Sequence, residues 1–265
     1  MGMHTLGPLA IPSSVLAGVV AFIVFSLLVA LGKQRIHPLL DAWSTRVLIF
    51  GMLAARAVYV ALHWDTFSAE PQRIVMIWQG GFDWVGGFTA AFLVTVLMKL
   101  PQKARAAGLG ILAVTGLATV ATTFALSGNA RGVALPDVTL YHPGGESFAL
   151  SSHAEGPLII NLWATWCPPC RRELPALAAH QNNHPDLPIL LVNLEEDPAT
   201  VQAYLDEQGL ALKGLAFDRT SALPKALGTV GVPVTLFFLN GELAELHAGE
   251  ITPEALQDKT RSIVR

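Results

Sequence analysis

One stretch decides the fold of the C-terminal half: Ile159-Ile160-Asn161-Leu162-Trp163-Ala164-Thr165-Trp166-Cys167-Pro168-Pro169-Cys170. It begins as an apolar run of strand length, and the residues after Cys170 favour a helix. The two cysteines are the only ones in the chain. Their placement puts the Cys167 sulfur at a helix N-terminus, where the dipole and free amides stabilise a thiolate. Because a second thiol lies one turn away, the motif predicts thiol–disulfide exchange.

The composition divides the chain of 265 residues into two unlike halves. Residues 1–131 carry nine Lys/Arg and four Asp/Glu, a net charge of +5, and residues 132–265 carry eight and sixteen, a net charge of −8. Charged residues make up only 14% of the chain, which is low for a soluble protein. No basic cluster with interleaved aromatic residues occurs, so nucleic acid is not an expected partner.

Four apolar stretches in the first half are long enough to cross a bilayer, which takes ~20 residues. They are roughly Ser14–Leu31, Trp43–Leu62, Phe82–Leu100 and Ala107–Ser127. Arg56 lies within the second stretch and Asp83 at the edge of the third. The first stretch has no basic segment before it, so we interpret it as a retained span and not as a signal peptide. We therefore predict a membrane domain over residues 1–131, an α-helical bundle of about four transmembrane helices.

Positive charges gather on two of the connections between these stretches. The first and third connections carry Lys33, Arg35, Arg46, Lys99, Lys103 and Arg105. By the positive-inside rule these connections are cytoplasmic, and both chain termini lie outside. Residues 132–265 are then expected to form a periplasmic domain of a protein of the bacterial inner (cytoplasmic) membrane.

The second half alternates strand and helix patterns. Strands are expected at Leu135–Leu140, Leu158–Trp163, Pro188–Leu194, Leu215–Phe217, Val234–Leu239 and Glu242–His247. Helices are expected after Cys167 with a kink at Pro175, between Asp197 and Gly209, and from Thr252 onward. Asn240-Gly241 is a hairpin signal, and Gly128–Gly132 is expected to be a linker. The pattern predicts a mixed α/β sheet.

The segment Asn161–Cys170 and the elements around it resemble a thioredoxin fold. Over roughly Leu135–Val264 the pattern resembles the TlpA/ResA-like branch of membrane-tethered bacterial thiol–disulfide oxidoreductases, which includes the cytochrome c maturation reductases. The resemblance implies that Cys167 is the exposed nucleophile and Cys170 the resolving thiol. It also implies that Gly231-Val232-Pro233 is the loop whose cis-proline faces the active site.

Further site residues follow from the same resemblance. Asn161 stands where thioredoxin has a buried aspartate, and an amide cannot do acid–base chemistry. Glu173 matches an acidic residue of this branch and is assigned a pKa-tuning or proton-relay role; the alternative is a surface glutamate near a helix start. Trp163 is expected in the core. The residues expected to contact the substrate are Trp166, Pro168, Val232 and Pro233.

Zinc binding and a purely structural disulfide are the alternatives to redox chemistry at the cysteine pair. With His180 and His184 the cysteines form a C-x2-C…H-x3-H string of the kind that binds zinc. The gap of nine residues between the pairs is short, and two prolines separate the cysteines, so neither a metal nor a cofactor is expected. A structural disulfide is disfavoured because so short a loop constrains little of the unfolded chain.

The first half resembles the N-terminal part of the prolipoprotein diacylglyceryl transferase family, which moves a diacylglyceryl group from phosphatidylglycerol to a lipoprotein cysteine. The resemblance rests on Leu6–Ile11, Ala54–Val60 and Ile77–Gly87. Where the family has a catalytic histidine this chain has Val85, so we expect no transferase activity. Arg56 is a candidate to hold a lipid phosphate, or it snorkels to the interface. Close helix packing is expected at Gly80, Gly81, Gly86 and Gly87.

The first half contains no cysteine, so it cannot pass electrons to the Cys167–Cys170 pair by dithiol exchange. A separate membrane electron donor is therefore expected, of the CcdA/DsbD kind in resembling families. The sequence predicts a membrane-anchored periplasmic thiol–disulfide oxidoreductase that reduces particular proteins, with apocytochrome c or copper-site proteins implied by the resemblance. A DsbA-like thiol oxidase, an active diacylglyceryl transferase with an auxiliary redox domain, and a redox-silent binding module remain as alternatives.

Overall fold

The computed structural model describes residues 3–6, 9–127, 133–229 and 231–264. The chain forms two compact units, one of residues Ser14–Ala125 and one of Leu126–Arg265 together with Met1–Ser13. Near the N-terminus, strands β1 (Met3–Leu6) and β2 (Leu9–Pro12) form an antiparallel pair. The expected linker Gly128–Gly132 lies outside the described residues.

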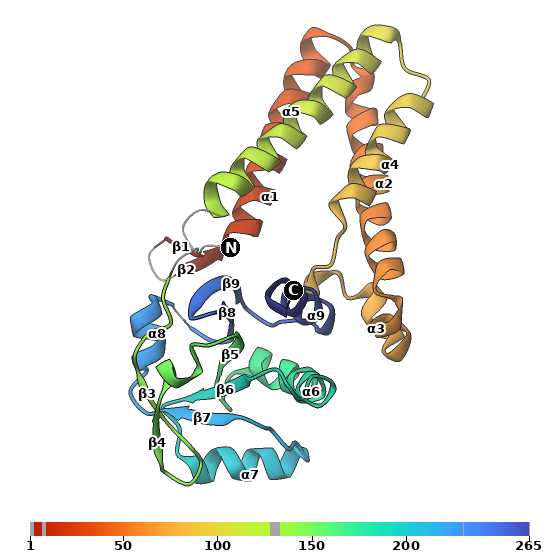
Figure 1. Ribbon diagram of the computed structural model, residues 1–265. Helices are drawn as coiled ribbons and strands as arrows, with labels where there is room; N and C mark the ends of the chain where they lie inside the picture. Colours follow the sequence, from red (N-terminus) through yellow and green to blue (C-terminus); the bar gives the residue numbers. More distant parts are fainter. Residues whose placement is uncertain (1–2, 7–8, 128–132, 230, 265) are drawn as a thin grey trace. The chain divides into compact units, whose positions relative to one another are not determined.

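The first unit is helical (Figure 1). Its long helices are α1 (Ser13–Arg35), α2 (Leu39–Leu62), α4 (Trp84–Leu97) and α5 (Gln102–Ser127). A short helix α3 (Trp64–Ala69) and two 3-10 turns, η1 (Pro71–Val75) and η2 (Ile77–Gln79), connect α2 to α4. In Figure 1, α1 lies beside α5 and α2 lies beside α4.

Three helical segments are long and apolar enough to cross a membrane: Val15–Arg35, Leu39–Leu62 and Gln102–Ala125. Helix α4 has 14 residues and is about 21 Å long, against a hydrocarbon layer of about 30 Å. The third apolar stretch was expected to form a full span over Phe82–Leu100, and this is wrong because its helix is shorter than the hydrocarbon layer. Asp83 starts the helix as its N-cap, with Oδ1 accepting from Gly86 N at 2.6 Å, and Met98 already has an extended backbone shortly before Pro101.

Glycines let α2 and α4 approach closely. A Cβ on Gly87 would lie 3.4 Å from the Gly51 carbonyl oxygen and 3.2 Å from Ala55 Cβ, and a Cβ on Gly86 would lie 2.7 Å from Val58 Cγ2. Gly81 is equally confined, whereas Gly80 faces open space. The expected role in helix packing therefore holds for Gly81, Gly86 and Gly87, and Gly80 is instead used for its positive φ of 78°.

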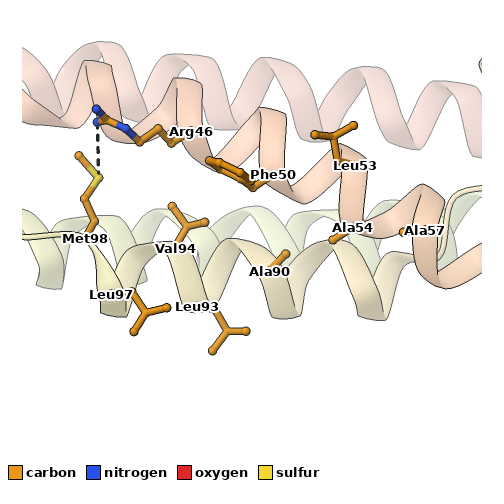
Figure 2. Close-up of a pocket in the computed structure, with 10 residues that line it drawn as sticks. All are labelled: Arg46, Phe50, Leu53, Ala54, Ala57, Ala90, Leu93, Val94, Leu97 and Met98. Carbon is orange, nitrogen blue, oxygen red and sulfur yellow. Dashed lines mark hydrogen bonds between the residues drawn. The ribbon is translucent and has the colours of Figure 1, made fainter.

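An apolar groove of about 600 Å³ runs between α2 and α4 (Figure 2). Nine of its ten lining residues are uncharged, and the tenth is Arg46, whose Nη1 lies 3.8 Å from Met98 Sδ at one end. The other lining residues are Phe50, Leu53, Ala54, Ala57, Ala90, Leu93, Val94, Leu97 and Met98. Such a lining is suited to contact with acyl chains in a bilayer.

The second unit contains a seven-stranded sheet in the order β4-β3-β7-β6-β5-β8-β9. The strands are β3 (Thr139–Tyr141), β4 (Ser147–Ala149), β5 (Pro157–Trp163), β6 (Ile189–Leu194), β7 (Leu215–Asp218), β8 (Val234–Leu239) and β9 (Glu242–Ala248). Strands β5, β6 and β7 pair in parallel, and β8 and β9 are antiparallel. The first strand begins later than expected, at Thr139, and neither β4 nor the short helix α8 (Ala222–Leu227) was expected.

Helices pack on both faces of this sheet. Helices α6 (Pro168–Asn183), α7 (Pro198–Gln208) and α9 (Pro253–Val264) contribute to one core cluster, and α8 (Ala222–Leu227) to the other. Side chains along β5 point alternately to the two faces of the sheet. Ile159 and Trp163 lie in the first cluster, and Leu158, Ile160 and Leu162 lie in the second. Asn161 therefore points toward the face that carries α6.

The expected turn and cap residues are confirmed. Asp197 caps α7 by accepting from Ala199 N at 2.8 Å. Asn240 and Gly241 both have positive φ and join β8 to β9 as a hairpin. Helix α6 runs through Pro175. Together with the sheet order, these elements form the thioredoxin fold that the sequence predicted.

Replacing Gly86 by alanine should destabilise the helical unit, because the new Cβ meets Val58 at 2.7 Å and the Ala54 carbonyl oxygen at 3.3 Å. We expect a loss of roughly 1–3 kcal/mol, seen as a lower midpoint when the helix signal is followed during heating in detergent. Gly110→Ala is the matched control, since nothing lies within 4 Å of its Cβ position. Equal midpoints for the two variants would contradict the close contact of α2 and α4.

Candidate active site

The cysteine pair lies where strand β5 gives way to helix α6. Cys167 is the N-cap residue of α6, and Cys170 is in its first turn. The two are joined as a disulfide, with Cys167 only 3% exposed and Cys170 fully buried. The expectation that Cys167 is exposed is therefore wrong for this disulfide form. Pro168 and Pro169 have no N–H, so the first amide that the helix can offer is that of Cys170. It donates to Cys167 Sγ at 3.3 Å, and with the helix dipole it favours negative charge on that sulfur after reduction.

Glu173 is buried one turn after Cys170. Its side chain is 2% exposed, so the interpretation as a surface glutamate is wrong. Asn161 Nδ2 donates to Glu173 Oε1 at 2.7 Å, and the Ile251 amide donates to Glu173 Oε2 at 2.7 Å. Asn161 Nδ2 also donates to Thr235 Oγ1 at 3.0 Å, its cross-strand neighbour on β8. The carboxyl group thus links β5, α6 and the segment before α9.

Burial raises the pKa of Glu173 from 4.5 to about 7, although the hydrogen bonds from Ile251 and Asn161 oppose the rise. The neighbouring Glu250 carboxylate raises the pKa further and Arg172 lowers it. A carboxyl group with this pKa exchanges a proton near neutral pH, which an ordinary surface glutamate does not.

The segment that follows β9 is fixed over this carboxyl group. Gly249 N donates to the Pro233 carbonyl oxygen at 2.9 Å, and Glu250 forms an ion pair with Arg172 at 2.6 Å. The loop that carries Pro233 and the helix that carries Glu173 are therefore held by one short segment, whose last residue is Ile251.

The expected substrate-contacting residues differ in exposure. Trp166 is 68% exposed and Pro168 is exposed, next to the disulfide. The Val232–Pro233 peptide bond is cis, as the resemblance implied. Val232 is half-buried against the core cluster that contains Cys167 and Cys170, and Pro233 is buried. Trp163 is fully buried, as expected.

Glu196 is a site residue that the sequence did not reveal. Its Oε2 accepts from Thr165 N at 2.7 Å and from Asn193 Nδ2 at 2.7 Å, and its Oε1 accepts from the Thr165 hydroxyl. It therefore fixes the loop that leads into Cys167. Glu196 could have been found from its position after β6. Because β5 and β6 are parallel neighbours, the residues after their carboxyl ends meet at one edge of the sheet.

The two histidines of the zinc-like string lie far along α6 from the cysteines. His180 is ten residues after Cys170, about 15 Å along the helix, and its Nε2 lies 3.0 Å from Thr260 Oγ1 on α9. Burial lowers the pKa of His180 to about 4. Among the residues that the structure describes, no group of three or more His, Cys, Asp and Glu could hold a metal ion.

Arg56 belongs to the helical unit and is largely buried there. Its guanidinium donates to four backbone oxygens: Arg73 O (2.6 Å), Gly80 O (2.7 Å), Gly81 O (3.0 Å) and Ile74 O (3.1 Å). The guanidinium therefore binds the connecting segment of its own unit, and snorkelling of Arg56 to the interface stays untested. Its binding of a lipid phosphate stays a prediction.

Two family models match different halves of the chain. The redoxin family model matches residues 130–253, and the prolipoprotein diacylglyceryl transferase family model matches residues 3–129. Each match covers just under half of the chain. The C-terminal half is therefore a redoxin domain of thioredoxin-like fold, and the N-terminal half has a transferase-family match.

Several curated relatives of the redoxin domain are named thiol–disulfide oxidoreductases or thiol:disulfide interchange proteins. The thiol-disulfide oxidoreductase ResA of Halalkalibacterium halodurans is 30% identical over 117 residues, which cover 43% of this chain and 66% of that protein. The thiol:disulfide interchange protein DsbE of Escherichia coli is 31% identical over 108 residues, 40% of this chain and 57% of that one. A crystal structure of a thiol:disulfide interchange protein from Chlorobium tepidum aligns with a TM-score of 0.45 at 22% identity, covering 52% of this chain and 99% of that one. The redoxin domain is therefore similar in sequence to proteins named ResA and DsbE.

The raised pKa of Glu173 should make the stability of the redoxin domain fall with pH. The unfolded state loses this proton above its ordinary pKa of 4.5, while the folded state keeps it up to about 7. Between these values the folded state binds more protons, so the free energy of unfolding falls as pH rises, by about 3 kcal/mol in total. Denaturant unfolding of residues 133–265 at several pH values measures the slope.

In the Glu173→Gln variant this slope should be lost, although its absolute stability is altered as well. Glu207→Gln, at an exposed position of α7, is the control and should keep the wild-type slope. An unchanged slope in Glu173→Gln would show that Glu173 ionises at an ordinary pKa.

Proposed function

We propose that this chain is a membrane-anchored thiol–disulfide oxidoreductase that reduces disulfides of particular protein substrates outside the cytoplasm. The observation that carries the proposal is the disulfide at the start of α6, with Cys167 Sγ at the first free amide of the helix. The names of the relatives of the redoxin domain support the same reaction class.

In the proposed reaction the reduced protein attacks through Cys167. Its thiolate bonds to one sulfur of the substrate disulfide, and the other substrate sulfur leaves as a thiolate and takes up a proton. The Cys170 thiolate then attacks Cys167 Sγ, so that the Cys167–Cys170 disulfide forms and the second substrate sulfur leaves. Two electrons pass from the dithiol to the substrate, which gains two protons.

Glu173 is proposed to accept the proton of the Cys170 thiol before this second step. Cys170 is fully buried, so water has poor access to its thiol. The Glu173 carboxyl group lies one helical turn further along α6 and has a pKa of about 7. It can therefore take a proton and release it near neutral pH.

Substrates are proposed to dock beside Trp166 and Pro168 on one side and Val232 and Pro233 on the other. Trp166 offers an exposed aromatic face for binding. The substrate class, apocytochrome c thiols or copper-site proteins, follows from the resemblance to the TlpA/ResA-like branch.

The dithiol must be regenerated by a second protein, because the chain has no other cysteine. We assign this role to a membrane thiol transporter of the CcdA/DsbD kind. The orientation of the helices supports a domain outside the cytoplasm: the connections at residues 36–38 and 98–101 lie at one end of the helical unit (Figure 1). Lys33, Arg35, Lys99, Lys103 and Arg105 flank these connections, and under the positive-inside rule they support the proposal that this end is cytoplasmic and both termini lie outside.

Diacylglyceryl transfer is not part of the proposed function. Val85 stands where the transferase family has its histidine, and its aliphatic side chain cannot exchange a proton. The transferase match in the first half is therefore interpreted as a membrane anchor.

The two cysteines should fail in different ways when replaced by serine. Cys167→Ser should abolish reduction of insulin disulfides by the full-length protein in detergent, because no nucleophile remains. Cys170→Ser should instead accumulate a mixed disulfide through Cys167, visible as a reducible band on a non-reducing gel, because the resolving thiol is missing.

Glu207→Gln, on the exposed face of α7, is the control for effects of mutagenesis and purification, and it should keep full activity. Insulin reduction that survives in Cys167→Ser, or a mixed disulfide that appears in Cys167→Ser but not in Cys170→Ser, would overturn the assignment of roles.

A further inference from the structure

The segment between α2 and α4, residues 63–83, presents apolar side chains on its outside. Trp78 is 76% exposed, and Trp84 at the start of α4 is 72% exposed. Trp64, Val75 and Ile77 are also exposed. Clustered exposed side chains of this size mark a surface that contacts something other than water.

The part of the segment next to α4 lies beside the last turns of α2. Asp83 N donates to Ala55 O at 3.0 Å, and Arg56 reaches the carbonyl oxygens of Gly80 and Gly81. Helix α2 continues for six residues past Arg56, about 9 Å. Helix α4 therefore starts roughly two turns short of the end of its partner, and the segment occupies the remaining depth.

Irregular backbone is tolerated at membrane depth only where its polar groups find partners in the protein. Arg56 supplies four hydrogen bonds to carbonyl groups of this segment, those of Arg73, Ile74, Gly80 and Gly81. Phe67, which belongs to the same segment, is buried, and the guanidinium carbon of Arg56 lies 5.2 Å from the centre of its ring. The polar backbone is thus turned inward and the large apolar side chains outward.

We propose that residues 63–84 lie in the interfacial layer of the bilayer, with Trp64, Trp78 and Trp84 as an aromatic anchor between headgroups and acyl chains. The indole ring suits this layer because it has a large apolar body and one N–H donor. The segment is continuous with α2, which is long and apolar enough to cross the membrane. Helix α4, with 14 residues, is too short to cross the bilayer alone, and the segment before it covers the remaining depth.

The occupant of this surface is lipid of no particular charge. The exposed charged side chains of the segment are the acidic Asp65 and Glu70, and Arg73 is buried. Anionic headgroups are therefore not attracted, and zwitterionic phosphatidylcholine is a sufficient partner.

The test uses the full-length protein in phosphatidylcholine vesicles and the quenching of tryptophan fluorescence. Trp78→Phe and Trp84→Phe should each remove a component that is quenched by lipid brominated close to the headgroup, and more weakly by lipid brominated near the chain end. Trp166→Phe is the matched control, because Trp166 is 68% exposed on the redoxin domain. It should remove a component that aqueous iodide quenches and brominated lipid does not.

The proposal is overturned if the Trp78 and Trp84 components respond to iodide as the Trp166 component does and not to brominated lipid. It is equally overturned if neither quencher reaches them, since a protein surface would then cover the segment. All three residues are exposed, so their replacement by phenylalanine leaves the core unchanged.

Discussion

The buried carboxyl group of Glu173 is the interaction on which the redox site depends. It accepts from Asn161 on β5 and from Ile251 before α9, while its own backbone belongs to α6. Three elements that are distant in the sequence are thereby fixed around the Cys167–Cys170 disulfide. Because the group is almost out of water, its proton affinity is set by the fold, which raises the pKa of Glu173 to about 7.

Much of this site could be predicted from the sequence, because its central parts are local. The cysteine spacing, the strand before it and the N-cap position all lie within Ile159–Cys170, and Asn240-Gly241 specifies its hairpin by itself. What was missed depends on contacts between distant segments. Glu196 accepts a hydrogen bond from Thr165, and Ile251 donates one to Glu173. The Ile251 donor is a backbone amide, so the residue type at that position does not predict the contact.

In the helical unit, hydropathy alone did not predict where the helices end. The apolar run Phe82–Leu100 has the length of a span, but Asp83 caps the helix and Met98 leaves it, so that 14 residues remain. The position of Arg56 in an apolar stretch is compatible with either lipid binding or snorkelling. The structure gives it a third role, in which four carbonyl groups of the connecting segment replace water around the guanidinium. Counting apolar residues could not reveal where those carbonyls are.

The proposed reduction of substrates requires a dithiol that is kept reduced outside the cytoplasm by another protein. The most direct measurement is the redox state of Cys167 and Cys170 in growing cells that make the protein at its natural level. Cells are quenched in acid, free thiols are labelled with a large maleimide, and the gel shift is compared with that of the Cys167→Ser/Cys170→Ser double variant. If the protein is a reductase, most molecules carry two labels. A protein that is mostly unlabelled, and therefore in the disulfide form, would contradict a reductase and support a thiol oxidase.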